Sequence, residues 1–88
     1  MHFDLFYELS VQDFAGSSER QVYHETLEEL ALADRLGFHA AWLVEHHFMP
    51  AYSHSSAPAL YLAAASQRTE NLRLGHAIVP LPYNHPVR

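Results

Sequence analysis

The residues best suited to chemistry in this sequence are Glu45, His46 and His47, which directly follow the apolar run Ala41–Val44. A short apolar run is typical of a buried strand, and the polar switch marks where the strand leaves the core. In parallel α/β proteins the carboxyl ends of the strands carry the chemistry. An imidazole exchanges a proton near neutral pH, and a neighbouring carboxylate favours its charged form. The pattern predicts that His46 holds or releases a proton beside Glu45.

Three runs rich in apolar and aromatic residues predict the strands that must position these side chains. We expect the strands near residues 3–9, 38–44 and 72–79. A loop is expected at residues 10–18, at the carboxyl end of the first strand. The strand starts recur after about 35 residues, which is the length of one β/α unit.

The first helix has recognisable start and stop signals. Ser18 followed by Gln21 fits a capping box, so the helix should begin near Glu19. Gly37 should end it, because glycine accepts the left-handed conformation that follows many helices.

The second helix should be capped by Ser55 or Ser56 and should carry Pro58 in its first turn. After the third strand, residues 85–88 read as the start of a further helix that the chain does not complete. The order βαβαβ with helical crossovers makes neighbouring strands parallel, because such connections are right-handed. We therefore expect one α/β domain over residues 1–88, with a three-stranded sheet that cannot close on itself.

Composition narrows the classes of partner. The formal charge is −5, all five basic residues are arginine, and cysteine is absent. Nucleic acids and anionic membranes need clustered basic residues, so neither is an expected partner. Disulfides and thiolate chemistry are excluded. No run approaches the ~20 apolar residues of a membrane span, and the start of the chain has no basic leader. A cytoplasmic location is expected.

Several motifs together resemble the amino-terminal part of the bacterial luciferase-like, flavin-dependent monooxygenase family. They are Trp-x-x-Glu-His-His-Phe at residues 42–48, Ala-Pro at 57–58 and Leu-Pro-x-x-His-Pro-Val-Arg at 81–88, and the likeness covers nearly the whole chain. The resemblance implies the amino-terminal βαβαβ portion of a (β/α)8 TIM barrel, truncated at the start of the third helix. It also implies reduced FMN and O2 acting on a small organic substrate; related branches use a deazaflavin for hydride transfer.

The resemblance also implies site residues. Glu45 and His46 would lie beside the flavin and the substrate, as catalytic and cofactor-binding residues, with His47 as a second imidazole. Ala77 and Ile78 would pack against the isoalloxazine ring, where the family often has a non-proline cis peptide. Members are commonly dimeric, so we expect a homo-oligomer or a complementing barrel chain.

Three other readings stay open. Glu45 and His46 are also compatible with polar loop residues that have no chemistry. Eight histidines and several acids suggest a metal-dependent hydrolase, although adjacent His46 and His47 should point to opposite faces and no His-x-His or His-Glu-x-x-His spacing occurs. With three glycines and no Gly-x-Gly-x-x-Gly phosphate cradle, the chain would supply only one wall of a flavin pocket. It would then be a non-catalytic fragment, or a split-barrel piece that needs a partner chain.

Overall fold

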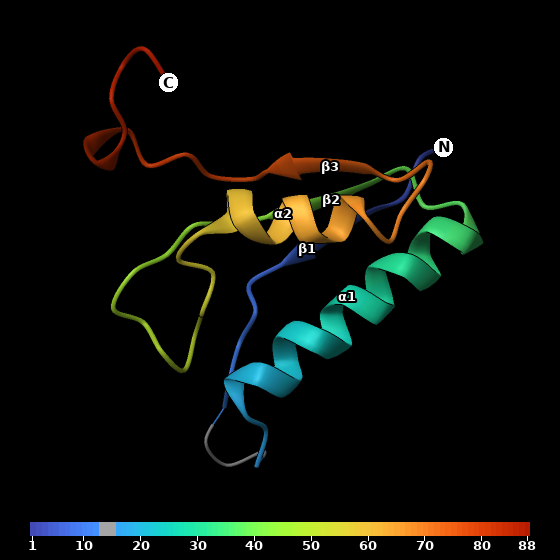
Figure 1. Cartoon of the computed structure of the whole chain (residues 1–88), viewed down its shortest axis with the longest axis horizontal. Coiled ribbons are helices and arrows are strands. Elements are labelled where there is room, and N and C mark those ends of the chain that lie inside the picture. The colour runs from blue at the N-terminus through green and yellow to red at the C-terminus, as the bar shows by residue number, and fades with distance from the viewer. Residues whose placement is uncertain (13–15) are drawn as a thin grey trace.

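The protein is described by a computed structural model that covers residues 1–12 and 16–88. Its elements in chain order are β1 (Asp4–Tyr7), α1 (Glu19–Leu36), β2 (Ala40–Leu43), α2 (Pro58–Ser66), β3 (Arg73–His76) and the 3-10 helix η2 (Leu81–Tyr83). The strands form one parallel sheet in the order β1-β2-β3, as Figure 1 shows. The predicted βαβαβ order is confirmed. Part of the loop expected at residues 10–18, namely residues 13–15, lies outside the described residues.

The three strands are shorter than the sequence predicts, and the third differs most. β3 ends at His76, although the Ala77 amide still donates to the carbonyl of Leu43 at 2.9 Å. After Val44 the chain leaves the sheet, and the His46 amide donates to Ser55 at 2.9 Å instead. The predicted strand residues 78 and 79 therefore have no neighbouring strand at their level of the sheet.

Helix α1 begins and ends where the sequence predicts. The Ser18 side chain accepts a hydrogen bond from the Gln21 amide at 3.1 Å, and Gly37 adopts φ 83°. Only half of the capping box forms, because the Gln21 side chain donates to Glu25 at 2.7 Å rather than returning to Ser18. The Ser18 side chain alone therefore caps the free backbone amides of the first turn.

Helix α2 does not use the predicted cap. Its N-cap is Ala57, which makes no side-chain hydrogen bond, although Pro58 occupies the first turn as expected. Ser55 cannot cap because its buried hydroxyl donates to the carbonyl of Val44 at 2.5 Å. Ser55, one of the two serines expected to cap the helix, therefore bonds the preceding loop to the end of β2. Residues 85–88 form a turn, and the third helix expected there stays a prediction.

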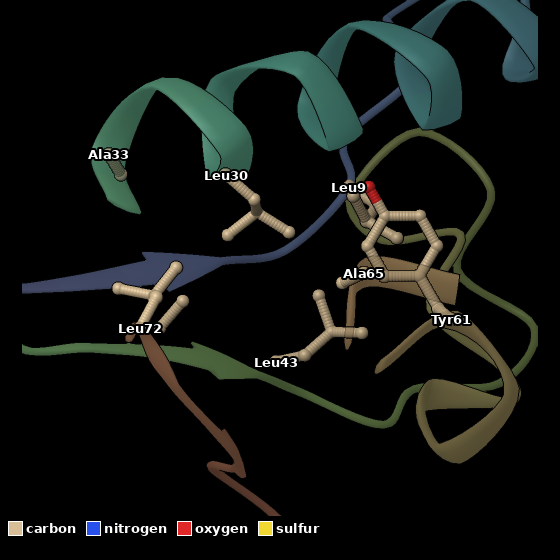
Figure 2. Close-up of a cluster of buried hydrophobic side chains, with 8 residues drawn as sticks. Leu9, Leu30, Ala33, Leu43, Tyr61, Ala65 and Leu72 are labelled. Atoms are coloured by element: carbon tan, nitrogen blue, oxygen red, sulfur yellow. The ribbon is translucent and has the colours of Figure 1, made fainter. Parts of the chain in front are cut away.

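Both helices cover one face of the sheet, and the hydrophobic core lies between them and the strands. In Figure 2 the side chain of Leu30 points from α1 toward the strands, and Tyr61 of α2 belongs to the same buried cluster. The Tyr61 hydroxyl donates to the carbonyl of Tyr23 at 3.1 Å, which satisfies the polar end of a buried ring. The buried cluster consists of Leu9, Leu30, Ala33, Ala41, Leu43, Tyr61, Ala65 and Leu72.

Asp34 joins the last turn of α1 to the entry of β3. Its carboxylate accepts hydrogen bonds from the backbone amides of Glu70, Asn71 and Leu72 at 2.8, 2.9 and 2.6 Å. These bonds hold the pKa of Asp34 below its usual value. One side chain thereby fixes the turn after α2, and with it the position at which β3 joins the sheet.

Within residues 1–12 and 16–88 no helix covers the opposite face of the sheet, and Trp42 lies on this face. Phe6, Trp42 and Gly75 are in register across the three strands, and the two aromatic rings are exposed. The Trp42 indole donates to Asp4 at 2.9 Å and lies over Gly75, where a Cβ atom would fall 2.5 Å from the ring. Gly75 is thus required by the close approach of the indole.

Replacing Gly75 with alanine should move this ring. The added methyl group cannot share space with the indole, so we expect a loss of about 1–3 kcal/mol in the free energy of unfolding, typical of overpacking. Trp42 is the only tryptophan, so its fluorescence emission reports the displacement directly. Gly37→Ala is the matched control: nothing lies near its Cβ, and it should destabilise through φ without changing emission. Unchanged emission in Gly75→Ala would contradict this packing.

Candidate functional site

The carboxyl ends of β1 and β2 are held together by the β2–α2 loop, residues 44–57. This loop folds back onto the residues that follow β1. The Ser53 hydroxyl donates to the carbonyl of Glu8 at 2.5 Å, and the His54 amide donates to the carbonyl of Leu9 at 3.0 Å. In Figure 1 the loop and the C-terminal segment extend toward the same end of the sheet. The polar side chains of two strand ends are therefore gathered at one edge.

Two residues of these loops have a left-handed backbone that is uncommon outside glycine. Leu9, buried after β1, has φ 56°, and Phe48, exposed in the β2–α2 loop, has φ 60°. Such conformations cost of order 1–3 kcal/mol and persist where the surrounding structure enforces them. The Leu9 conformation is held from the loop side by the His54 amide. It turns the chain sharply just beyond Glu8.

Glu45 pairs with His47, not with His46. Glu45 Oε1 lies 2.9 Å from His47 Nε2, and both side chains are half-buried. The ionic partner of Glu45 is thus His47, and the expected role of Glu45 beside His46 stays a prediction.

His46 turns toward β1 and meets Glu8. The distance from His46 Nε2 to Glu8 Oε2 is 3.5 Å, and both side chains are about one-quarter exposed. Tyr52 donates to the other oxygen, Glu8 Oε1, at 3.1 Å, which raises the pKa of the Tyr52 hydroxyl. The Tyr52 ring also packs edge-on against the His46 ring, with centroids 5.4 Å apart. Glu8, His46 and Tyr52 thus form one cluster.

Sequence reasoning missed Glu8 and Tyr52. A signal for Glu8 was available: it directly follows β1, at the same edge of the sheet where Glu45 and His46 follow β2. No comparable signal existed for Tyr52, because its approach depends on how the β2–α2 loop folds back. The course of this loop is fixed by hydrogen bonds from the Ser53 hydroxyl and the His54 amide to the backbone carbonyls of Glu8 and Leu9. No residue pattern specifies these contacts.

The structure separates the predicted site residues between two hollows. Glu45 lines a hollow of about 570 Å³, whose other walls include His76, Val79 and the start of α2. His46 and His47 line a smaller one of about 270 Å³ within the β2–α2 loop. In the described residues, Glu45 and His46 therefore line different hollows.

Ala77 and Ile78 lie just beyond β3. Both are exposed, and neither lines the hollow that contains His46. The peptide bond between them is trans, as are all peptide bonds of the described residues, so the expected cis bond is absent there. A non-proline cis bond costs about 3–4 kcal/mol and needs enclosing structure, which two exposed residues lack.

Residues 1–12 and 16–88 contain no group of three or more histidine or acidic side chains arranged to hold a metal ion. Among the helices of the same residues, none is long and apolar enough to cross a membrane.

Comparison with known proteins gives one consistent result. A family model described as luciferase-like monooxygenase matches residues 1–88. Limonene 1,2-monooxygenase of Rhodococcus erythropolis is 42% identical over 72 residues, which is 82% of this chain and 18% of that protein. The oxygenase component of the flavin-dependent trigonelline monooxygenase of Acinetobacter baylyi is 36% identical over 100% of this chain and 24% of that protein.

Two solved structures superpose on nearly the whole chain. The FMN complex of the oxygenating constituent of 3,6-diketocamphane monooxygenase from Pseudomonas putida has a TM-score of 0.86 and 25% identity, covering 99% of this chain and 23% of that one. Monooxygenase RslO1 from Streptomyces bottropensis has a TM-score of 0.86 and 35% identity, covering 99% and 26%. The likeness confirms the predicted fold class, the amino-terminal βαβαβ portion of a (β/α)8 barrel. The chain spans about one-fifth of the length of its curated relatives.

Proposed function

The chain belongs to the luciferase-like monooxygenase family, and from this we propose that it forms the amino-terminal wall of the active site of a flavin-dependent monooxygenase. The proposed reaction uses O2 and a small organic substrate: one oxygen atom enters the substrate and the other leaves as water. A reduced flavin, when bound, supplies the two electrons. The single observation that carries the proposal is the family match over all 88 residues, combined with two histidines and two acids at the carboxyl edge of the sheet.

The residues at this edge fit a flavin. Ile78 and Val79 are 40% and 53% exposed, and they present an apolar surface next to the hollow that Glu45 lines. A flavin ring needs an apolar surface that excludes water, and with it competing reactions. It also needs a few polar groups that fix its orientation. We propose that Ala77 and Ile78 contact the ring and that Glu45 and His46 border it.

FMN is the flavin we propose. The supporting observation is that the Pseudomonas putida relative, which has the same fold over this segment, was solved in complex with FMN. A deazaflavin would leave the contacts of Ile78 unchanged but would imply hydride transfer without O2. Consumption of O2 in the assay described below distinguishes the two cofactors.

Within this site we assign His46 as the residue that holds or moves a proton at its imidazole, and Glu45 as a second catalytic group that acts with His47. Half-burial leaves His46 accessible to a ligand while partly excluding water. An imidazole is suited to this task because it changes protonation near neutral pH. Glu45 faces the larger hollow and would act on a ligand from that side.

We further propose that the protein acts as a homo-oligomer or with a complementing barrel chain. In the described sheet the outer strands β1 and β3 each have one open edge, and Phe6 and Trp42 are exposed on the helix-free face. Open edges and exposed apolar faces are normally covered by further structure. A cytoplasmic location is proposed in addition, since a chain without cysteine gains nothing from an oxidising compartment.

The test is isotope incorporation. The protein is incubated with chemically reduced FMN, isotopically labelled O2 and a panel of small organic substrates, and the products are examined by mass spectrometry. We expect a product that carries one labelled oxygen atom. Label in water or peroxide alone, with every substrate unchanged and the protein shown to bind FMN, would contradict monooxygenation. Substrate oxidation without O2 would indicate hydride transfer instead.

A further inference from the structure

We propose that Glu8 is a positioning residue for His46: its carboxylate accepts a hydrogen bond from the imidazole Nε2–H and leaves Nδ1 as the nitrogen that exchanges a proton with a ligand. The inference rests on the proposed function for the identity of the ligand. The pairing itself is independent of that function, because it concerns only residues of this chain.

The first observation is an unsatisfied acceptor. Glu8 Oε2 is the single buried side-chain oxygen or nitrogen among the described residues that makes no hydrogen bond. A buried carboxylate oxygen without a donor is costly, so native structures rarely keep one without a reason. His46 Nε2 lies 3.5 Å away, at the edge of hydrogen-bond range. A small closing movement would therefore satisfy this oxygen with the imidazole N–H.

The second observation is that the carboxylate is already oriented. Tyr52 donates to Glu8 Oε1 at 3.1 Å, and the Ser53 hydroxyl donates to the Glu8 carbonyl at 2.5 Å. The same Tyr52 ring packs against His46. The acid is thus held from its backbone and from one oxygen, while its second oxygen faces the imidazole. Catalytic imidazoles are commonly fixed in one tautomer by such a carboxylate.

The third observation is that Glu45 and Glu19 pair with histidines other than His46. Glu45 pairs with His47 at 2.9 Å, and Glu19 lies 3.4 Å from His54. Among the acids that the structure describes, Glu8 is the one that lies within ion-pair distance of His46. Among the hydrogen bonds of the described residues, none uses His46 Nδ1. This nitrogen is free to meet a ligand, which is the arrangement that a proton-transferring imidazole needs.

The test uses the two acid–imidazole pairs as mutual controls. Imidazole N–H signals of the flavin-free, isotope-labelled protein are followed by NMR in the wild type and in Glu8→Gln and Glu45→Gln. We expect a protected Nε2–H signal for His46 that is lost in Glu8→Gln and kept in Glu45→Gln, with the reverse for His47. A His46 signal that survives in Glu8→Gln, or a wild-type His46 protonated at Nδ1 instead of Nε2, would overturn the proposal.

A kinetic measurement distinguishes positioning from a structural role. In the flavin-loaded protein, Glu8→Gln should lower kcat about 10- to 100-fold, as losing an orienting partner does, while KM and thermal stability stay near wild type. Tyr52→Phe, which removes only the second partner of Glu8, should cause a smaller fall in kcat. Equal kcat in Glu8→Gln and wild type would contradict positioning. Inactivity of the wild type would refute the proposed function but leave the NMR result valid.

Discussion

Replacing His46 with alanine should lower the turnover of the flavin-loaded protein by about 10²- to 10⁴-fold, the range for loss of a general acid or base. The imidazole is half-buried at the carboxyl edge of the sheet, where it lies 3.5 Å from Glu8 and packs against Tyr52. Stability should change little, because the ring contributes no hydrogen bond to the core. Steady-state kinetics, together with thermal unfolding of the same preparation, measure both effects.

His24→Ala is the matched control for this experiment. His24 is exposed on α1 and belongs neither to the Glu8–His46–Tyr52 cluster nor to the lining of the two hollows, so the same chemical change should leave turnover unaltered. His47→Ala tests the second imidazole and should disturb Glu45 rather than Glu8. If His46→Ala keeps full activity with the substrate that the wild type oxidises, the assignment of His46 is wrong.

Truncating Leu30 to alanine should produce the largest loss of stability among single core changes on α1. Leu30 is 1% exposed and packs in the cluster that joins both helices to the sheet (Figure 2). Removing a fully buried leucine leaves a cavity and typically costs about 2–5 kcal/mol. That is a large share of the ~5–15 kcal/mol by which domains are stable, so partial unfolding at room temperature is expected. Chemical denaturation followed by circular dichroism measures the change.

Leu36→Ala is the control, since it makes the same chemical change on the same helix at a residue that is 66% exposed. It should alter the free energy of unfolding by less than about 0.5 kcal/mol, as surface substitutions do. Equal losses at the two positions would show that the core is not organised around the inward face of α1.

The sequence was sufficient for the order and the parallel direction of the strands, because each β/α unit carries its own local signals. Gly37 ends α1 through backbone freedom, and Pro58 fits the first turn of α2; both effects are local. The cap of α2 was not predictable in this way. Ser55 and Ser56 were both candidates, but Ser55 is buried with its hydroxyl bonded to Val44, and the N-cap position falls on Ala57.

The candidate site was predictable in position but not in its pairing. Alternation along an extended chain, applied to Glu45 and His47, would have given their contact, whereas adjacency suggested Glu45 and His46. The contact between Glu8 and His46 joins residues 38 positions apart and depends on the register of β1 with β2. Pairings of this kind are set by tertiary structure, so the chemistry of a single residue run does not determine them.

The most direct measurement of the central claim is a crystal structure of the protein with FMN bound. The account predicts that the isoalloxazine ring lies at the carboxyl edge of the sheet, in contact with Ile78 and bordered by His46, with the Glu8 carboxylate on the far side of that imidazole. FMN bound elsewhere, with Ile78 and His46 both clear of the cofactor, would contradict the claim that this segment forms a wall of the flavin site.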